Sequence, residues 1–198
     1  MKGARVVLFS IMVLTGGLLL NSCNVLRKIP EGKHLLDKNT IKTDHPEFKE
    51  NITAIIKQKP NRKILGVFRF HLGVYFLADH GKRSTKFKKW LKTAVGEEPI
   101  FIDTALTHKS TEQIAIFMQN SGYFDARVTD SVKYRKTTAK ATYTIDAGEP
   151  YRFRETNYQI VDSVIEREVM KDTAKSLLVP GDIYSSSTIQ KERDRIST

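Results

Sequence analysis

The sequence is poor in the residue groups that build disulfides, metal sites and phosphate loops. It has one cysteine, Cys23, so no intramolecular disulfide can form. None of its histidines stands one turn from another metal ligand on a predicted helix, which argues against zinc. Gly66 and Gly73 have the wrong spacing for a glycine-rich phosphate loop. We therefore expect no catalytic residues, no metal, no cofactor and no enzymatic activity.

An apolar run long enough to span a bilayer comfortably, which takes ~20 residues, is also missing. The longest run, Val6–Leu20, follows the basic residues Lys2 and Arg5 and matches the apolar region of a signal peptide. Leu20-Asn21-Ser22-Cys23 comes next and resembles the bacterial lipobox. This order predicts a lipoprotein signal peptide over residues 1–22.

The chemistry of such a signal assigns a role to each residue at its end. A peptidase would cut between Ser22 and Cys23, the Cys23 thiol would form a thioether to diacylglycerol, and the new amino group would be acylated with a fatty acid such as palmitate. Each buried CH₂ contributes about 0.8 kcal/mol, so two or three chains anchor a protein firmly. We predict lipid attachment at Cys23 and a tether over residues 23–34. The alternatives are an ordinary signal peptide with an incidental cysteine, or an uncleaved anchor.

Negative charge is scarce in one part of the chain. The formal net charge is +11, and the segment Lys57–Lys92 holds eleven basic residues against one acid, Asp79. Nucleic acid is not expected as a partner, because the predicted export removes the chain from the cytoplasm. Lipid headgroups, lipopolysaccharide phosphates or an acidic protein are the polyanions outside it. The alternative is that this segment is only a solvated face.

Residues 35–60 predict a strand followed by a helix. Residues 35–43 mix β-branched and polar residues, as a strand does. Asp44 and Glu47 have the spacing of a capping box at the start of a helix, which Pro60 ends.

An insertion of about residues 60–107 follows. Ile64–Ala78 is strongly apolar, and its periodicity leaves helix or strand open. It packs either as core or as a surface that meets a membrane interface or a partner. Ser84–Thr93 predicts a basic amphipathic helix.

A second helix and two strands close this part of the chain. Ser110 and Gln113 have the spacing of a capping box, and Gly122 suits the end of that helix. The sequence then alternates over Tyr123–Arg135, which predicts a half-buried strand with Asp130 as an exception on its apolar face. The alternation over Ala141–Ile145 predicts its antiparallel partner.

After Gly148-Glu149-Pro150 the order of elements restarts. Tyr151–Val161 is strand-like, Ser163 and Glu166 predict a capped helix, and Ser187 and Gln190 predict another. No closing pair of strands follows. We expect a domain over 35–147 and a partial second one over 148–198, less stable than the first.

Two motifs carry a resemblance to a known family. Asn120-Ser121-Gly122-Tyr123-Phe124-Asp125-Ala126-Arg127-Val128, within a β-α-α-β-β order, resembles a POTRA (polypeptide-transport-associated) domain, as does Gly148-Glu149-Pro150-Tyr151. With the lipobox, the chain is similar to the TamL type of the BamA/TamA family of outer-membrane assembly factors. The segments 58–66 and 191–196 also resemble parts of that family.

The resemblance implies an α+β fold, in which helices lie on one face of a small mixed sheet. Family members end in a membrane β-barrel, which needs many alternating segments of ~10 residues. None occurs after residue 147, so we expect an N-terminal fragment without the barrel.

The resemblance also implies a function: a module tethered to the outer membrane, facing the periplasm, that binds unfolded clients or assembly partners by strand addition. The family implies that the binding edge is the strand from Phe124 to Tyr134. Alternatives are a structural lipoprotein scaffold, or a polyanion-binding module using residues 57–92. The expected client-binding residues are Phe124, Ala126, Arg127, Val128, Thr129 and Ser131.

Overall fold

The computed structural model describes residues 21–79 and 85–197. Most of the predicted signal peptide, residues 1–20, lies outside this range. Cys23 stands in a 3₁₀ helix, η1, over Asn21–Lys28. Across the described ranges, no helix is both long and apolar enough to cross a membrane.

The chain forms two compact units. The first comprises the chain up to Thr40, Gln58–Thr104 and Ser131–Ala141. The second comprises Ile41–Lys57, Ala105–Asp130 and Thr142–Thr198.

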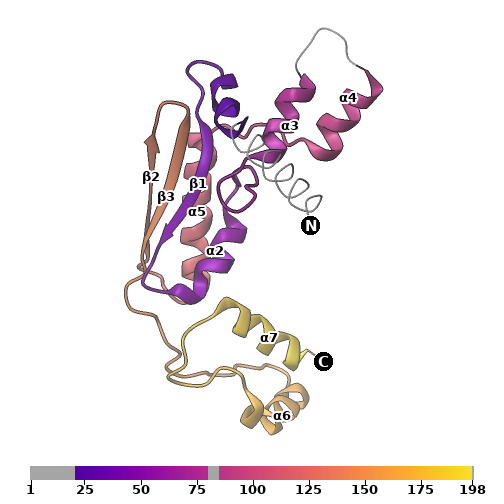
Figure 1. The fold of residues 1–198 in the computed structure, drawn as a ribbon. Coiled ribbons are helices and arrows are strands. Elements are labelled where there is room, and N and C mark those ends of the chain that lie inside the picture. Colours follow the sequence, from indigo (N-terminus) through magenta and orange to yellow (C-terminus); the bar gives the residue numbers. More distant parts are fainter. Residues whose placement is uncertain (1–20, 80–84, 198) are drawn as a thin grey trace, which may run out of the picture. The chain divides into compact units, whose positions relative to one another are not determined.

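A three-stranded sheet has the order β1-β3-β2. Its strands are β1 (Leu35–Lys42), β2 (Arg127–Tyr134) and β3 (Thr138–Asp146). Figure 1 shows β2 and β3 antiparallel and β1 running in the same direction as β3, so the sheet is mixed. Side chains of β3 alternate: Ala139, Ala141, Tyr143 and Ile145 are buried, while Lys140 and Thr144 are exposed and Thr142 is partly exposed. This alternation indicates that one face of the sheet is covered.

Two helices provide that cover. They are α2 (Lys49–Ile55) and α5 (Thr104–Asn120), which lie on the same face of the sheet in Figure 1. Ile52 of α2 and Ile114 and Met118 of α5 are fully buried. The predicted α+β class and its β-α-α-β-β order are therefore confirmed.

The predicted start of α5 is wrong. Ser110 is not an N-cap, because the helix begins six residues earlier, at Thr104, and Ser110 lies buried inside it. Its hydroxyl donates to the Leu106 carbonyl at 2.7 Å, as serine does in mid-helix, and accepts from the Lys57 amide at 3.1 Å. The capping pattern was misleading because a serine inside a helix can satisfy its hydroxyl by donating to the carbonyl four residues earlier, without capping anything.

The first helix also starts differently from its prediction. A 3₁₀ turn, η2 (Pro46–Phe48), precedes α2 and has no side-chain cap. The Glu47 carboxylate instead lies 2.9 Å from Nδ1 of His45. Proline at the first position favours this tight start.

The insertion is helical where its periodicity left the choice open. Residues Ile64–Phe68 form a tight turn closed by an antiparallel bridge, and α3 follows over Phe70–Asp79. The predicted basic helix is α4 (Lys86–Trp90), capped by the Thr85 hydroxyl and continued by a π-helical turn, η3 (Leu91–Val95). The insertion contributes to the core through Leu72, which is fully buried, while Leu65 and Leu77 are exposed.

The last part of the chain holds two more α-helices, α6 (Ser163–Lys171) and α7 (Ser186–Ile196), and a 3₁₀ turn, η4 (Thr173–Lys175). The cap of α6 is Asp162 rather than Ser163, and its carboxylate accepts from the next amides of the helix. The predicted strand Tyr151–Val161 does not form. Only an isolated bridge between Arg152 and Ile183 is present there, because few backbone groups find partners beyond Phe153.

Candidate functional site

Strand β2 is an edge of the sheet, since the order β1-β3-β2 leaves it with one neighbour. The other edge, β1, is partly covered by residues 100–102. The amide of Leu36 donates to the Ile100 carbonyl at 2.8 Å, and the amide of Ile102 donates to the His34 carbonyl at 2.8 Å. Along the described chain, β2 therefore offers the longer open edge for an added strand.

The register of the hairpin decides which backbone groups of β2 face outward. A two-residue turn joins the strands, with the Arg135 amide donating to the Thr138 carbonyl at 2.7 Å. In this register Val132 faces Ala141 and Asp130 faces Tyr143, so residues on the covered side of the sheet stand opposite one another. Pairs in an antiparallel ladder alternate between bonded and unbonded.

It follows that Arg127, Thr129, Ser131 and Lys133 direct their amides and carbonyls toward β3. The even-numbered residues Val128, Asp130, Val132 and Tyr134 direct theirs to the open edge. Of the residues expected to bind clients, Val128 alone presents its backbone there. Arg127, Thr129 and Ser131 instead contribute exposed side chains on the uncovered face. The alternation in the sequence divides β2 into odd-numbered and even-numbered residues. Only the position of the turn shows which of the two sets directs its backbone groups to the open edge.

Two expected edge residues lie outside the strand, which begins at Arg127 instead of Phe124. The Ala126 amide donates to the Tyr123 carbonyl at 3.3 Å, which makes a turn of this segment. Phe124 packs its ring against Tyr151 and Tyr184, with centroids 5.1 and 5.0 Å away. Phe124 and Ala126 therefore do not belong to the edge.

Asp130 departs from the apolar pattern of its face because α5 supplies a partner. Its carboxylate accepts from the Thr111 hydroxyl at 2.9 Å and lies 3.6 Å from the His108 ring. His108 is also 3.6 Å from Glu112, one turn along α5. The predicted start of this helix at Ser110 did not place His108 and Glu112 on one helix. No group of three metal-ligating side chains suited to an ion occurs within the described ranges.

The two family-like motifs meet at Gly122. Its φ of 97° is in the left-handed region, and its carbonyl accepts from the Tyr151 amide at 2.8 Å. Tyr151 in turn accepts from the Tyr184 amide at 2.8 Å. Tyr123, next in the motif, is buried against His45 and Phe48. The left-handed backbone at this junction explains why the motif holds a glycine here.

Ion pairs within the first unit neutralise part of the basic segment Lys57–Lys92. Asp37 on β1 binds both Lys63, at 2.6 Å, and Arg69. Partial burial raises the pKa of the Asp37 carboxyl, but these two cations outweigh burial and hold the pKa below its usual value. Arg62 pairs with Glu97 and Lys92 with Asp79. The net charge of this segment therefore overstates its capacity to bind a polyanion.

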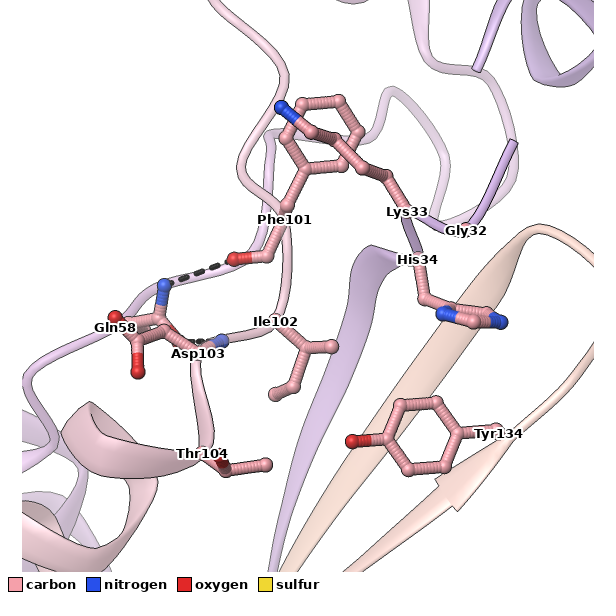
Figure 2. Close-up of a pocket in the computed structure, with 9 residues that line it drawn as sticks. All are labelled: Gly32, Lys33, His34, Gln58, Phe101, Ile102, Asp103, Thr104 and Tyr134. Atoms are coloured by element: carbon pink, nitrogen blue, oxygen red, sulfur yellow. Dashed lines mark hydrogen bonds between the residues drawn. The ribbon is translucent and has the colours of Figure 1, made fainter. Parts of the chain in front are cut away.

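A shallow pocket of about 590 Å³ lies beside the start of β1. Figure 2 shows His34 and Tyr134 on one side and Phe101 on the other. The Gln58 side chain bridges the Phe101 carbonyl and the Asp103 amide, at 3.0 and 2.9 Å. Lys33 lies over the Phe101 ring at 5.0 Å. The pocket is built from backbone bonds and ring contacts that fix residues 100–103 against β1.

Comparisons with known proteins found structural neighbours only. No protein-family model and no curated protein matches the chain. One neighbour is the crystal structure of Haemophilus influenzae BamA POTRA3-5, at 18% identity and a TM-score of 0.41, covering 86% of this chain and 56% of that one. Another is the N-terminal domain of Omp85 from Thermosynechococcus elongatus, at 13% identity and a TM-score of 0.23, covering 85% and 86%. This chain thus spans little more than half the length of the first.

Proposed function

We propose that this chain is the membrane-tethered module of an outer-membrane protein assembly factor, which faces the periplasm and binds unfolded client or partner chains by adding them to β2. The observation that carries the proposal is the open edge of β2. Its outward amides and carbonyls come from Val128, Asp130 and Val132, and nothing in the described chain pairs with this edge. The element order and the two motifs joined at Gly122 support the same family of functions.

Strand addition suits a module with many clients. Main-chain hydrogen bonds supply affinity whatever the client sequence, while side chains on alternate positions supply only a preference. The uncovered face of β2 carries Arg127, Thr129, Ser131 and Lys133, which are exposed. Polar and charged residues on an edge strand keep it soluble while its backbone stays available.

The register gives a direct test with a matched pair of variants. Val132→Pro removes an outward amide, so we expect it to weaken binding of an unfolded barrel-protein peptide while the hairpin persists. Val132→Ala keeps that amide and should bind nearly as well as the wild type. Ser131→Pro removes an inward amide and should instead disrupt the hairpin.

Crosslinking or titration with the peptide measures binding, and circular dichroism with thermal melting measures folding. Equal binding by the wild type and both Val132 variants would exclude strand addition at β2. If binding is lost only in variants whose thermal melting transition is also lost, the effect is one of folding. Comparing Val128→Pro with Val128→Ala, at another outward amide, then decides whether the edge of β2 binds the peptide.

A further inference from the structure

The helices α3 and α4 expose large apolar side chains. Phe87 and Trp90 on α4 are 66% and 56% exposed, and their rings stack on each other with centroids 6.0 Å apart. Leu77 on α3 is 65% exposed. Single exposed apolar residues are common, but aromatic rings stacked in the open on a five-residue helix are informative.

The turn before α3 exposes two further apolar side chains, one of them at a cost in backbone conformation. Leu65 is 85% exposed and has a φ of 51°, in the left-handed region that disfavours residues with a side chain. Val67 is 66% exposed. Such strain persists where the surrounding structure enforces it and is frequent at binding surfaces. Here the bridge between Ile64 and Phe68 enforces it.

Part of the positive charge that the ion pairs leave over lies on α4. Lys92, after α4, pairs with Asp79 and sits 4.6 Å above the Tyr75 ring. Lys86 and Lys89 form no ion pair with any described residue, and residues 86–95 contain no acid. Aromatic rings flanked by lysines are the composition of a segment that lies at a membrane interface.

The buried side of α3 packs against η1, the segment that bears Cys23. Leu72 of α3 is fully buried with Ile29 and Leu35, and Val25 and Leu26 of η1 pack against this cluster. A Cβ at Gly73 would lie 3.4 Å from Val25 Cγ2, so α3 approaches η1 closely. His71 and the Val95 carbonyl, 2.9 Å apart, tie η3 back to α3. The exposed surface is therefore positioned by the chain that directly follows the predicted lipid.

We propose that Phe87 and Trp90 of α4 insert at the headgroup level of an anionic phospholipid bilayer, with Lys86 and Lys89 binding its phosphates. The inference rests on the proposed membrane location and deepens it. The acyl chains predicted at Cys23 would hold the protein to the bilayer without fixing its orientation, and a basic and apolar patch beside the tether would add a second contact with the membrane. Docking of α4 would also limit rotation of the first unit about its tether.

Trp90 is the only tryptophan in the chain, so its emission reports directly on this surface. The full chain, lipidated and as Cys23→Ser, is mixed with phosphatidylglycerol or phosphatidylcholine vesicles. We expect emission to move to shorter wavelength and to be quenched by brominated acyl chains on the anionic vesicles, in both forms. Lipid labelling of Cys23 is measured separately, so a failure of the proposed lipidation stays distinct from a failure of docking.

A charge-matched pair of variants identifies the site. Lys86→Gln with Lys89→Gln should weaken binding of the Cys23→Ser chain to anionic vesicles by roughly 25-fold, since each surface lysine contributes about fivefold. Lys57→Gln with Lys59→Gln changes the net charge equally and should have a much smaller effect. Equal losses in the two pairs would overturn the assignment to α4. So would an unchanged Trp90 spectrum on anionic vesicles, or a shift given by single-stranded RNA and not by vesicles.

Discussion

At the scale of single residues, glycine at position 122 is required by its neighbours. A Cβ there would lie 2.5 Å from the Tyr184 carbonyl oxygen, and φ is 97°. Both the close approach and the left-handed backbone favour glycine. Gly148 shares the positive φ, 67°, but has open space around its Cα. Comparing substitutions at the two glycines therefore distinguishes the cost of backbone strain, present at both, from the cost of a steric clash, present only at Gly122.

We expect Gly122→Ala to lower the free energy of unfolding by more than the roughly 1–3 kcal/mol of backbone strain alone. Gly148→Ala should cost about 1–2 kcal/mol, from strain only. Chemical denaturation of the full chain measures both. Equal losses would show that Tyr184 moves aside at little cost.

Glu192 is the most elaborately bonded carboxylate in the second unit. It is buried, and it accepts from Arg195, Tyr158, Ser176 and the Leu177 amide at 2.8–3.0 Å. The hydrogen bonds from Arg195, then those from Leu177, Ser176 and Tyr158, outweigh burial and lower its pKa from 4.5 to about 2. This carboxylate ties α7 to the chain around Ser176.

The lowered pKa predicts a pH dependence. Because the folded state holds Glu192 ionised, its contribution to stability is complete above pH 4.5 and is lost as the pH falls from 4.5 toward 2. Glu192→Gln should be less stable at neutral pH by roughly 1–3 kcal/mol, and the gap should close over that range. Thermal melting against pH checks it, and a constant gap would contradict it.

At the scale of elements, the segment 148–198 leaves apolar side chains on and around its helices exposed. Val161 is fully exposed, Val164 and Ile165 of α6 are more than half exposed, and α6 has no buried residue. In contrast, α5 buries five of its residues. Since burial of apolar area is the main stabilising contribution, we expect these two regions to differ in local stability.

We therefore expect amides of 151–198 to exchange with solvent faster than those of 35–147. Hydrogen exchange followed by mass spectrometry resolves the two ranges. The buried Glu192 cluster should give α7 more protection than α6. Equal protection across both ranges would refute the expected difference.

Helix α5 shows how one element coordinates several others. Its buried Ser110 and Thr107 hydroxyls hydrogen-bond the Tyr143 hydroxyl of β3, and burial raises the pKa of that tyrosine. Thr111 binds Asp130 of β2. A polar stripe inside the core thus aligns the helix with two strands, because each buried hydroxyl must find its own partner.

At the scale of the whole molecule, we expect membrane attachment to depend on Cys23. We predict that Cys23→Ser abolishes lipid labelling and releases the protein from membranes in a high-salt wash, which also removes electrostatic contacts. Protease added to intact cells should spare the wild type, because the residues after Cys23 lack the acidic run that directs some lipoproteins to the cell surface. Retention with labelling in the variant would contradict lipidation, and rapid proteolysis would contradict the orientation.

The sequence by itself determined the β-α-α-β-β order over residues 35–147 and the faces of β2, because burial of one face imposes a period that is readable locally. The alternation in β2 and β3 follows from that period, whereas the periodicity of the insertion left helix or strand open. Even Asp130, the exception, was visible as such, although its partner Thr111 was not.

Only the tertiary structure decided what depends on partners distant in the chain. The true start of α5, the outward amides of β2 and the contact between Gly122 and Tyr184 each need a neighbour that no local pattern names. The same holds for charge: Asp37 pairs with two cations of the basic segment, Lys63 and Arg69, whereas Lys86 and Lys89 on the helix of Trp90 form no ion pair with a described residue. Local periodicity records which side of an element is buried, whereas pairing depends on which elements the fold brings together.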